Sequence, residues 1–163
     1  MYTVFEVLNS RALDVSWLDR LKSILMGTAF ELEKADQAAV VSDLHHIWRD
    51  IYSTIGLRQG MSTEALRFAA TLRTKEAPSR PLGEEPSVVL LRHQAVTAQT
   101  IRDIGSWLLT VTSASDGMAA NRRINAVTRI VQARLLAIAL TLRDDLKPRE
   151  RATALPPRSF HSL

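Results

Sequence analysis

The sequence predicts an all-α protein, a multi-helix bundle, on three observations. Glycine and proline are scarce, with six of each among 163 residues, and runs of β-branched residues are short. Nearly every long segment repeats its apolar residues every three or four positions, which is the period of one helix face. The length is that of one ordinary domain, so a single compact unit is expected.

The first core helix is predicted over Ser16 to Met26. Ser16 followed by Asp19 resembles a capping arrangement, with the acidic residue in the first turn. Gly27 is expected to loosen the chain after this helix. The apolar residues that share its predicted buried face are Leu18, Leu21 and Leu25.

A long helix is predicted next, after a shorter piece through Phe30 and Leu32. Asp36 is expected to cap this helix, and Gly56 and Gly60 bracket the break that follows it. Its core-facing stripe falls at i, i+4, i+7 and i+11, on Val40, Leu44, Ile47 and Ile51.

Ser62 is expected to cap a further helix that ends near Lys75. Its apolar side carries Leu66, Ala69, Ala70 and Leu72. Residues 77–86 hold three prolines and a glycine and are predicted to be a loop, because X-Pro dipeptides resist the helical region. This loop either divides two helical subdomains or is a long surface connection within one domain.

Three segments complete the predicted organisation of the chain. Val88 to His93 suits a short helix, and Thr97 is expected to cap a longer one that ends at Gly117 or Asn121. The inner face of that longer helix carries Ile101, Ile104, Leu108 and Val111. A last helix over about 123–142 is apolar around much of its circumference from residue 131 onward, so we expect it at the centre of the bundle. Residues 1–147 are predicted to form the helical domain, and 148–163 a disordered tail.

The composition limits the partners and the compartment. Lys and Arg number 21 against 17 for Asp and Glu, so the excess of positive charge that could attract an anionic partner is small. The chain has no cysteine, which leaves no disulfide framework and no thiolate metal site. It has no apolar run of 18 residues and no secretory signal after Met1, so we expect a cytoplasmic protein without a membrane partner.

The densest group of polar side chains near the amino end is Glu6, Asn9 and Arg11. Tyr2 to Leu8 is predicted to form the last turns of a helix, and Asn9 with Ser10 stops it, since both side chains can bond nearby backbone. A carboxylate, an amide and a guanidinium at such a corner suit a phosphate or a base edge. The alternative is a structural clamp, in which Glu6 and Arg11 pair to hold the turn.

A second set of candidates is the arginine group Arg122, Arg123 and Arg129, together with Arg134. Arg122 and Arg129 are seven residues apart and would share one helix face, from which they could contact phosphates. The alternative is that these arginines form solvated ion pairs with acidic residues such as Asp103 and Asp116.

Other chemistry is not indicated. His45 and His46 are adjacent, so on a helix they point about 100° apart and cannot chelate one metal ion. No nucleophile motif and no glycine-rich phosphate loop is present, so no catalytic residue and no metal ligand is assigned. Trp17, Trp48 and Trp107 fall on or beside apolar stripes, where packing is favoured over base stacking.

On Phe5, Glu6, Asn9, Arg11 and Leu13, the amino end resembles the F-E-x-x-N-x-R-G-x-x-L signature of the GmrSD-type restriction endonuclease family. That signature belongs to the helical part of the family's N-terminal ParB/sulfiredoxin-like domain. Residues 14–25 look like the helix that follows the signature, and looser similarity extends to residues 63–68 and 121–126. Ala12 stands where the family usually has glycine.

The resemblance implies a fold, a function and a set of partners. The helical bundle would normally pack on a ParB-like α/β unit, in a protein that restricts foreign or modified DNA and depends on a nucleoside triphosphate and a divalent metal. Arg11 would contact the phosphate at the edge of that pocket. The family's D-G-Q-Q-R motif and His-Asn-His nuclease domain do not occur in these residues. We therefore expect a fragment that lacks its N-terminal and C-terminal domains, is inactive alone, holds no cofactor itself and meets DNA through the full-length protein. The alternative is a stand-alone helical module that binds protein or DNA without catalysis.

Overall fold

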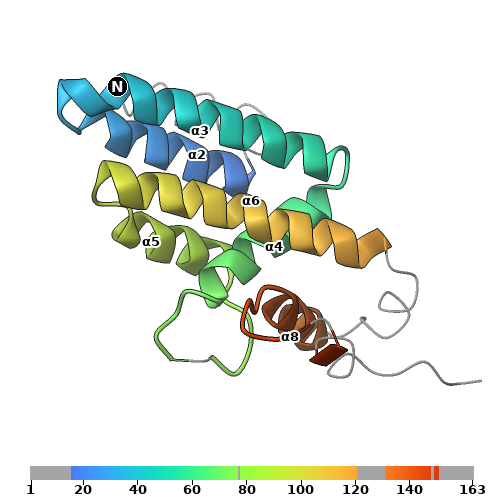
Figure 1. The fold of residues 1–163 in the computed structure, drawn as a ribbon. Coiled ribbons are helices and arrows are strands. Elements are labelled where there is room, and N and C mark those ends of the chain that lie inside the picture. Colours follow the sequence, from blue (N-terminus) through green and yellow to red (C-terminus); the bar gives the residue numbers. More distant parts are fainter. Residues whose placement is uncertain (1–15, 77, 121–130, 148, 151–163) are drawn as a thin grey trace, which may run out of the picture.

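The computed structural model describes residues 16–76, 78–120, 131–147 and 149–150, and these residues form an all-helical bundle without a strand (Figure 1). The predicted fold class is confirmed. The described helices, in chain order, are α2 (Trp17–Phe30), α3 (Lys34–Ile55), α4 (Gln59–Thr71), α5 (Glu84–Gln94), α6 (Ala98–Ala120) and α8 (Val131–Thr141).

The two longest helices, α3 and α6, lie side by side and run in the same direction (Figure 1). Arg102 near the start of α6 donates to Asp43 close to the middle of α3, with Nε and Oδ2 2.7 Å apart. At the other end, Arg58 just beyond α3 donates to Asp116 near the end of α6, over 2.6 Å. Helix α2 packs antiparallel on α3, because Asp19 at its start bonds Tyr52 close to the end of α3.

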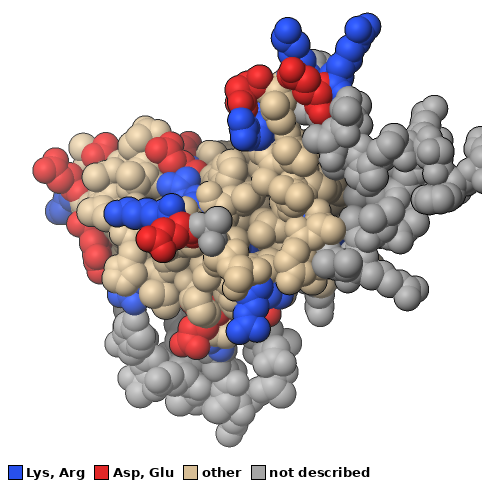
Figure 2. All heavy atoms as spheres, turned by 90° about the horizontal axis from the view of Figure 1, so that it is seen from below, with Lys and Arg blue, Asp and Glu red and all other residues tan. Residues whose placement is uncertain are grey.

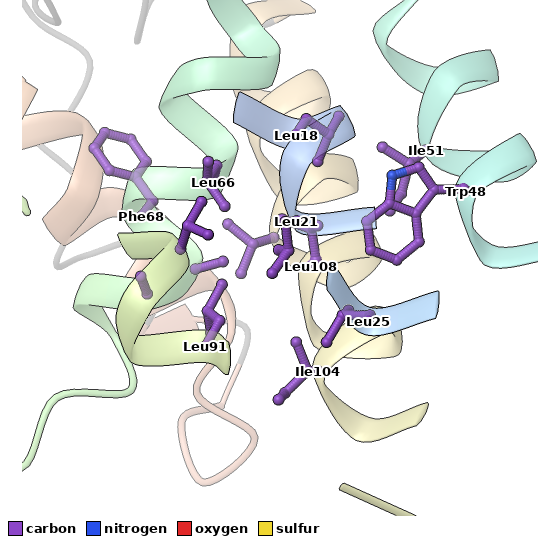
Figure 3. Close-up of a cluster of buried hydrophobic side chains, with 14 of the residues drawn as sticks. Leu18, Leu21, Leu25, Trp48, Ile51, Leu66, Phe68, Leu91, Ile104 and Leu108 are labelled. Carbon is purple, nitrogen blue, oxygen red and sulfur yellow. The ribbon is translucent and has the colours of Figure 1, made fainter. Parts of the chain in front are cut away.

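One core joins the helices on both sides of the loop between α4 and α5. Figure 3 shows side chains from α2, α3, α4, α5 and α6 meeting in a single apolar cluster. The predicted faces of α2 and α6 are buried throughout, and Val40, Leu44 and Ile51 are buried on α3. The largest fully buried side chains are Trp48, Phe68, Leu21, Leu25, Leu44, Ile51, Leu66, Leu91, Ile101, Ile104, Leu108 and Ile138.

The helix expected at the centre of the bundle lies at its edge. Residues 123–130 of that prediction fall outside the described residues, and α8 packs chiefly on α6. Ala137 and Ile138 are its buried side chains, whereas Leu136 is 62% exposed. The central position belongs to α6, which contacts every other described helix. Apolar residues on all sides of a helix show only that the helix is hydrophobic. Which helix lies at the centre depends also on its length and on the helices that pack against it.

Several predicted helix ends are wrong by up to one turn. Helix α2 continues through Gly27 to Phe30, because its buried face outweighs a cost of about 1 kcal/mol for one helical glycine. Helix α3 starts at Lys34, so Asp36 lies inside its first turn rather than at its cap. Of the two predicted ends of α6, Gly117 is wrong, because the helix continues to Ala120, and Asn121 lies outside the described residues.

The ends of α4 and α5 also differ from the predictions. Helix α4 starts at Gln59, with Gly60 and Ser62 inside it, and ends at Thr71 rather than near Lys75. Helix α5 starts at Glu84, so Pro86 lies in its first turn, where proline is tolerated because that N–H needs no helical partner. The predicted caps are confirmed at Ser16, which accepts from Asp19 N, and at Thr97, which accepts from Thr100 N over 3.2 Å.

The three tryptophans pack as predicted, but their indole N–H groups differ. Trp107 donates to the backbone oxygen of Ala69 over 2.9 Å. Trp48 is fully buried, and its Nε1 has no hydrogen-bond partner. A buried donor without an acceptor carries a desolvation cost that the folded state does not recover.

This contrast predicts the relative stability of two matched variants. Burial alone would make Trp48→Phe the costlier change, because Trp48 is the more buried ring. Trp48→Phe also removes an unpaired donor, whereas Trp107→Phe removes a hydrogen bond. We therefore expect Trp107→Phe to lower the free energy of unfolding more than Trp48→Phe, by about 1 kcal/mol. Urea denaturation of both variants measures this difference, and the reverse order would contradict it.

Gly105 allows the close approach of α3 and α6. A Cβ at this position would lie 3.3 Å from both Ile47 Cδ1 and Leu44 Cδ2, which is tighter than ordinary contact. Gly117 lies on the same helix, and a Cβ there would meet nothing within 4 Å. Both glycines have a helical backbone, but only Gly105 has neighbouring side chains that a larger residue would press against.

We expect Gly105→Val to lower the free energy of unfolding by roughly 1–3 kcal/mol, because its methyl groups overpack the α3–α6 contact. Gly117→Val is the control, since it changes helix propensity without overpacking. It is expected to raise stability by about 0.3 kcal/mol. Thermal or urea unfolding of both variants tests this, and equal effects would mean that Gly105 does not set the helix separation.

Candidate functional site

None of the site residues proposed from the sequence at the amino end or between α6 and α8 lies within the described part of the chain. Glu6, Asn9 and Arg11 fall in 1–15, and Arg122, Arg123 and Arg129 fall in 121–130. Their contacts therefore remain predictions. The described residues do show where each of these segments joins the bundle.

Both segments join the bundle away from the end at which α6 begins, the first about level with the middle of α6 and the second at the far end of α6 (Figure 1). Helix α2 begins at Trp17, directly after residues 1–15, and α6 ends at Ala120, directly before residues 121–130. Because α2 is antiparallel to α3, and α3 is parallel to α6, the start of α2 and the end of α6 lie toward the same end (Figure 1).

The arginine at the far end of the predicted strip, Arg134, forms an ion pair. Its Nε lies 2.9 and 3.0 Å from the two carboxylate oxygens of Glu64, and its Nη2 also donates to Glu64. The ion-pair interpretation holds for Arg134, but with Glu64 as its partner. Two acidic residues were named as possible partners of these arginines. Asp116 instead accepts a hydrogen bond from Arg58, and Asp103 accepts one from Gln99 over 2.7 Å.

The first turn of α2 holds a polar cluster that the sequence indicated in part. Ser16 Oγ donates to Asp19 Oδ2 over 2.6 Å and accepts from Asp19 N over 3.1 Å. Tyr52, 33 residues away, donates its hydroxyl to the other carboxylate oxygen of Asp19. Burial raises the pKa of Tyr52 far above its usual value, and the hydrogen bond and charge of Asp19 raise it further. The hydroxyl therefore stays protonated as a donor.

Two cations lie over aromatic rings on opposite flanks of α2. The Arg20 guanidinium is 4.5 Å from the ring centroid of Trp17, and the Lys22 amine is 5.6 Å from that of Tyr52. The spacing of Trp17 and Arg20, three residues apart on one helix, could have indicated the first contact. Tyr52 gave no such signal, because its partners are distant in sequence.

The other charged groups of the described ranges do not form a metal site, and on the face in Figure 2 they do not form a patch of one sign. Across the ranges that the structure describes, no group of three His, Asp or Glu side chains could hold a metal ion. His45 and His46 are exposed, and His46 Nδ1 lies 2.8 Å from Ser42 O. On the face in Figure 2, basic and acidic side chains alternate around a broad uncharged area. No helix in the described ranges is long and apolar enough to cross a bilayer.

Comparison with known proteins yields no match for this chain among family models, curated proteins or solved structures.

The hydroxyl of Tyr52 predicts a pH dependence. Because folding raises the pKa of Tyr52, the folded protein binds this proton more tightly than the unfolded chain does. The contribution of the bond to Asp19 is then fully present below about pH 10 and is lost as the pH rises above it. We expect Tyr52→Phe to be less stable than the wild type at pH 8, with a gap that closes toward pH 12. Urea denaturation across this range measures the gap, and a constant gap would contradict the assignment.

Proposed function

We propose that this chain is the helical portion of a GmrSD-like, nucleotide-dependent DNA restriction protein. The proposal rests on the Phe5–Leu13 resemblance and on a helix that starts, capped by Ser16, directly after it. In this proposal the bundle packs on a ParB-like α/β unit, and the complete protein supplies the catalytic groups, the nucleoside triphosphate and the divalent metal. DNA is the partner of the complete protein, and this portion is inactive alone.

The observation that carries the proposal is that the start of α2 and the end of α6 both lie away from the end of the bundle at which α6 begins. A pocket built from Glu6, Asn9 and Arg11 would be joined to the bundle at the start of α2, and Arg122, Arg123 and Arg129 at the end of α6. Two arginine-bearing segments anchored on the same half of the bundle suit the several phosphates of a nucleotide or a DNA strand. Arg11 is the proposed phosphate contact, since its fork of donors matches oxyanion geometry.

A second candidate function is a stand-alone helical module that binds protein or DNA without catalysis. One observation favours it: the described helices bury a large shared core among themselves, including Trp48, Phe68 and Leu108. Such a core can stabilise a domain without a further unit. In this alternative the Arg11 segment has no nucleotide to bind.

Arg11→Ala separates the two functions. In the complete GmrSD-like protein, this change is expected to weaken nucleoside triphosphate binding by about tenfold or more, the loss typical of a charge-assisted hydrogen bond. Equilibrium titration with a fluorescent triphosphate analogue measures the affinity. Arg92→Ala is the matched control, because Arg92 is an exposed arginine on α5. Binding that is unchanged in Arg11→Ala would overturn the restriction proposal and support the interaction module.

A further inference from the structure

We propose that the outward face of α8 is a contact surface for a second copy of this chain, whose own α8 packs on it antiparallel across a two-fold axis. The inference goes beyond the proposed function and does not depend on it. It starts from Leu136, whose side chain is 62% exposed in the middle of α8. Leu57 and Val96 are more exposed, but they lie between helices, and Phe30 is the last residue of α2. Within the described ranges, Leu136 is therefore the large apolar side chain that is most exposed inside a helix.

Contacts with the bundle decide which side of α8 faces outward. Ala137 and Ile138 are buried. Arg134 binds both carboxylate oxygens of Glu64 on α4, with its Nε 2.9 and 3.0 Å from them. At 3.6 residues per turn, these three α8 side chains point about 100° or more away from Leu136. The contacts that hold α8 in place therefore present the face centred on Leu136 to the outside.

This outward face is uncharged along most of α8. Its members lie within about 60° of Leu136 around the helix and are exposed or half-buried. They are Gln132, Ala133, Leu136, Ala139 and Leu140. Figure 2 views the molecule from below, the side on which α8 lies in Figure 1, and shows a broad area without Lys, Arg, Asp or Glu. The face suits another apolar surface rather than a charged partner, because a charge buried there would be unpaired.

The order of residues on the face suits a copy of itself. Helix α8 has 11 residues, and Leu136 is its central one. Ala133 and Ala139 stand three positions before and after it. A two-fold contact requires one patch to be complementary to itself. In an antiparallel pair centred on Leu136, each Ala133 faces Ala139 of the second copy, and these small side chains let the helix axes approach to about 8 Å. The two Leu136 side chains then meet at the axis.

Charge at the end of the face selects the antiparallel direction. Arg143 lies two turns beyond Leu136 on the same side of α8, and its Nε donates to Asp145 over 2.7 Å. A parallel pair would bring the two copies of Arg143 together, and like charges repel. An antiparallel pair places them about 20 Å apart, at 1.5 Å of rise per residue. The contact then has an uncharged centre and charged groups at its rim, as protein interfaces do.

Sedimentation velocity of the 163-residue chain over a concentration series measures the association. One pair of short helices buries less than the about 1,200–2,000 Å² of a standard interface, so we expect a reversible dimer at roughly tens to hundreds of micromolar. Leu136→Lys is expected to weaken it about tenfold or more, because two like charges meet at the axis. The control Val96→Lys, at an exposed apolar residue outside α8, leaves the dissociation constant within twofold. Equal loss in the control would overturn the site.

A charge swap tests the two-fold symmetry. Residue 136 faces its own copy only if the axis passes through it, so opposite charges at this position restore the contact. We expect Leu136→Lys and Leu136→Glu each to associate weakly, and their equimolar mixture to associate about tenfold more tightly than either alone. Lysine and glutamate are both good helix formers, and circular dichroism melts establish that the variants remain folded. A mixture no tighter than its components would overturn the proposal.

The absence of cysteine from the sequence allows a direct readout of direction. Ala133→Cys and Ala139→Cys are mixed and oxidised at a concentration at which the wild type dimerises. The antiparallel pair predicts disulfides between the two variants, because facing Cα atoms then lie within disulfide reach. Disulfides only within each variant would mean a parallel pair and would overturn the arrangement.

Other occupants of the face give different results, and each overturns the proposal. A chain that is monomeric at every concentration, with a Leu136→Cys thiol that resists maleimide labelling, would have the face covered by its own residues. A monomeric chain whose thiol is labelled freely would leave the face to a different protein. None of these results alters triphosphate binding by Arg11→Ala, so the restriction function is tested separately.

Discussion

The parallel packing of α3 and α6 is the contact on which the rest of the bundle depends. It is the most extensive helix pair, and it needs Gly105, because a side chain there would press on Leu44 and Ile47. With these helices in close contact, α2 and α4 pack alongside them and α5 closes the core between α2 and α4 (Figures 1 and 3). Because α3 and α6 run in the same direction, the chain must come back from the end of α3 to the start of α6. The helices α4 and α5 make this connection.

Polar contacts also fix the carboxyl-terminal ends of α3 and α6 against each other. Arg58 follows Gly56, whose φ of +57° turns the chain out of α3, and donates to the carbonyls of Thr54 and Ile55 over 2.5 and 3.1 Å. It also pairs with Asp116 on α6. An exposed ion pair alone contributes little stability, at most about 1 kcal/mol. Arg58 also satisfies carbonyls that the end of a helix leaves without partners, so it joins α3 to α6 where both chains turn.

The predictable parts of the fold were those that depend on local periodicity. The buried faces of α2 and α6 follow from spacings of three and four, and the cap at Ser16 follows from neighbouring residues. Helix ends were less predictable, because tertiary packing carries α2 past Gly27 to Phe30. Only the local part of the cluster at the start of α2 could be predicted from the sequence. Its Ser16–Asp19 bond is local, but Tyr52 reaches Asp19 only after α3 has folded back along α2.

That long-range bond links the fold to the proposed sites. Tyr52 holds the first turn of α2 against the end of α3, so the point at which residues 1–15 enter the bundle is set by the α3 helix rather than by α2 alone. The end of α6 is tied to the same region through Asp116 and Arg58. A ligand that contacts the segments before α2 and after α6 therefore meets two anchors whose separation is set by the α3–α6 packing. Loosening that packing at Gly105 would alter the separation of the anchors without touching either segment, which makes the core contact part of the proposed site's geometry.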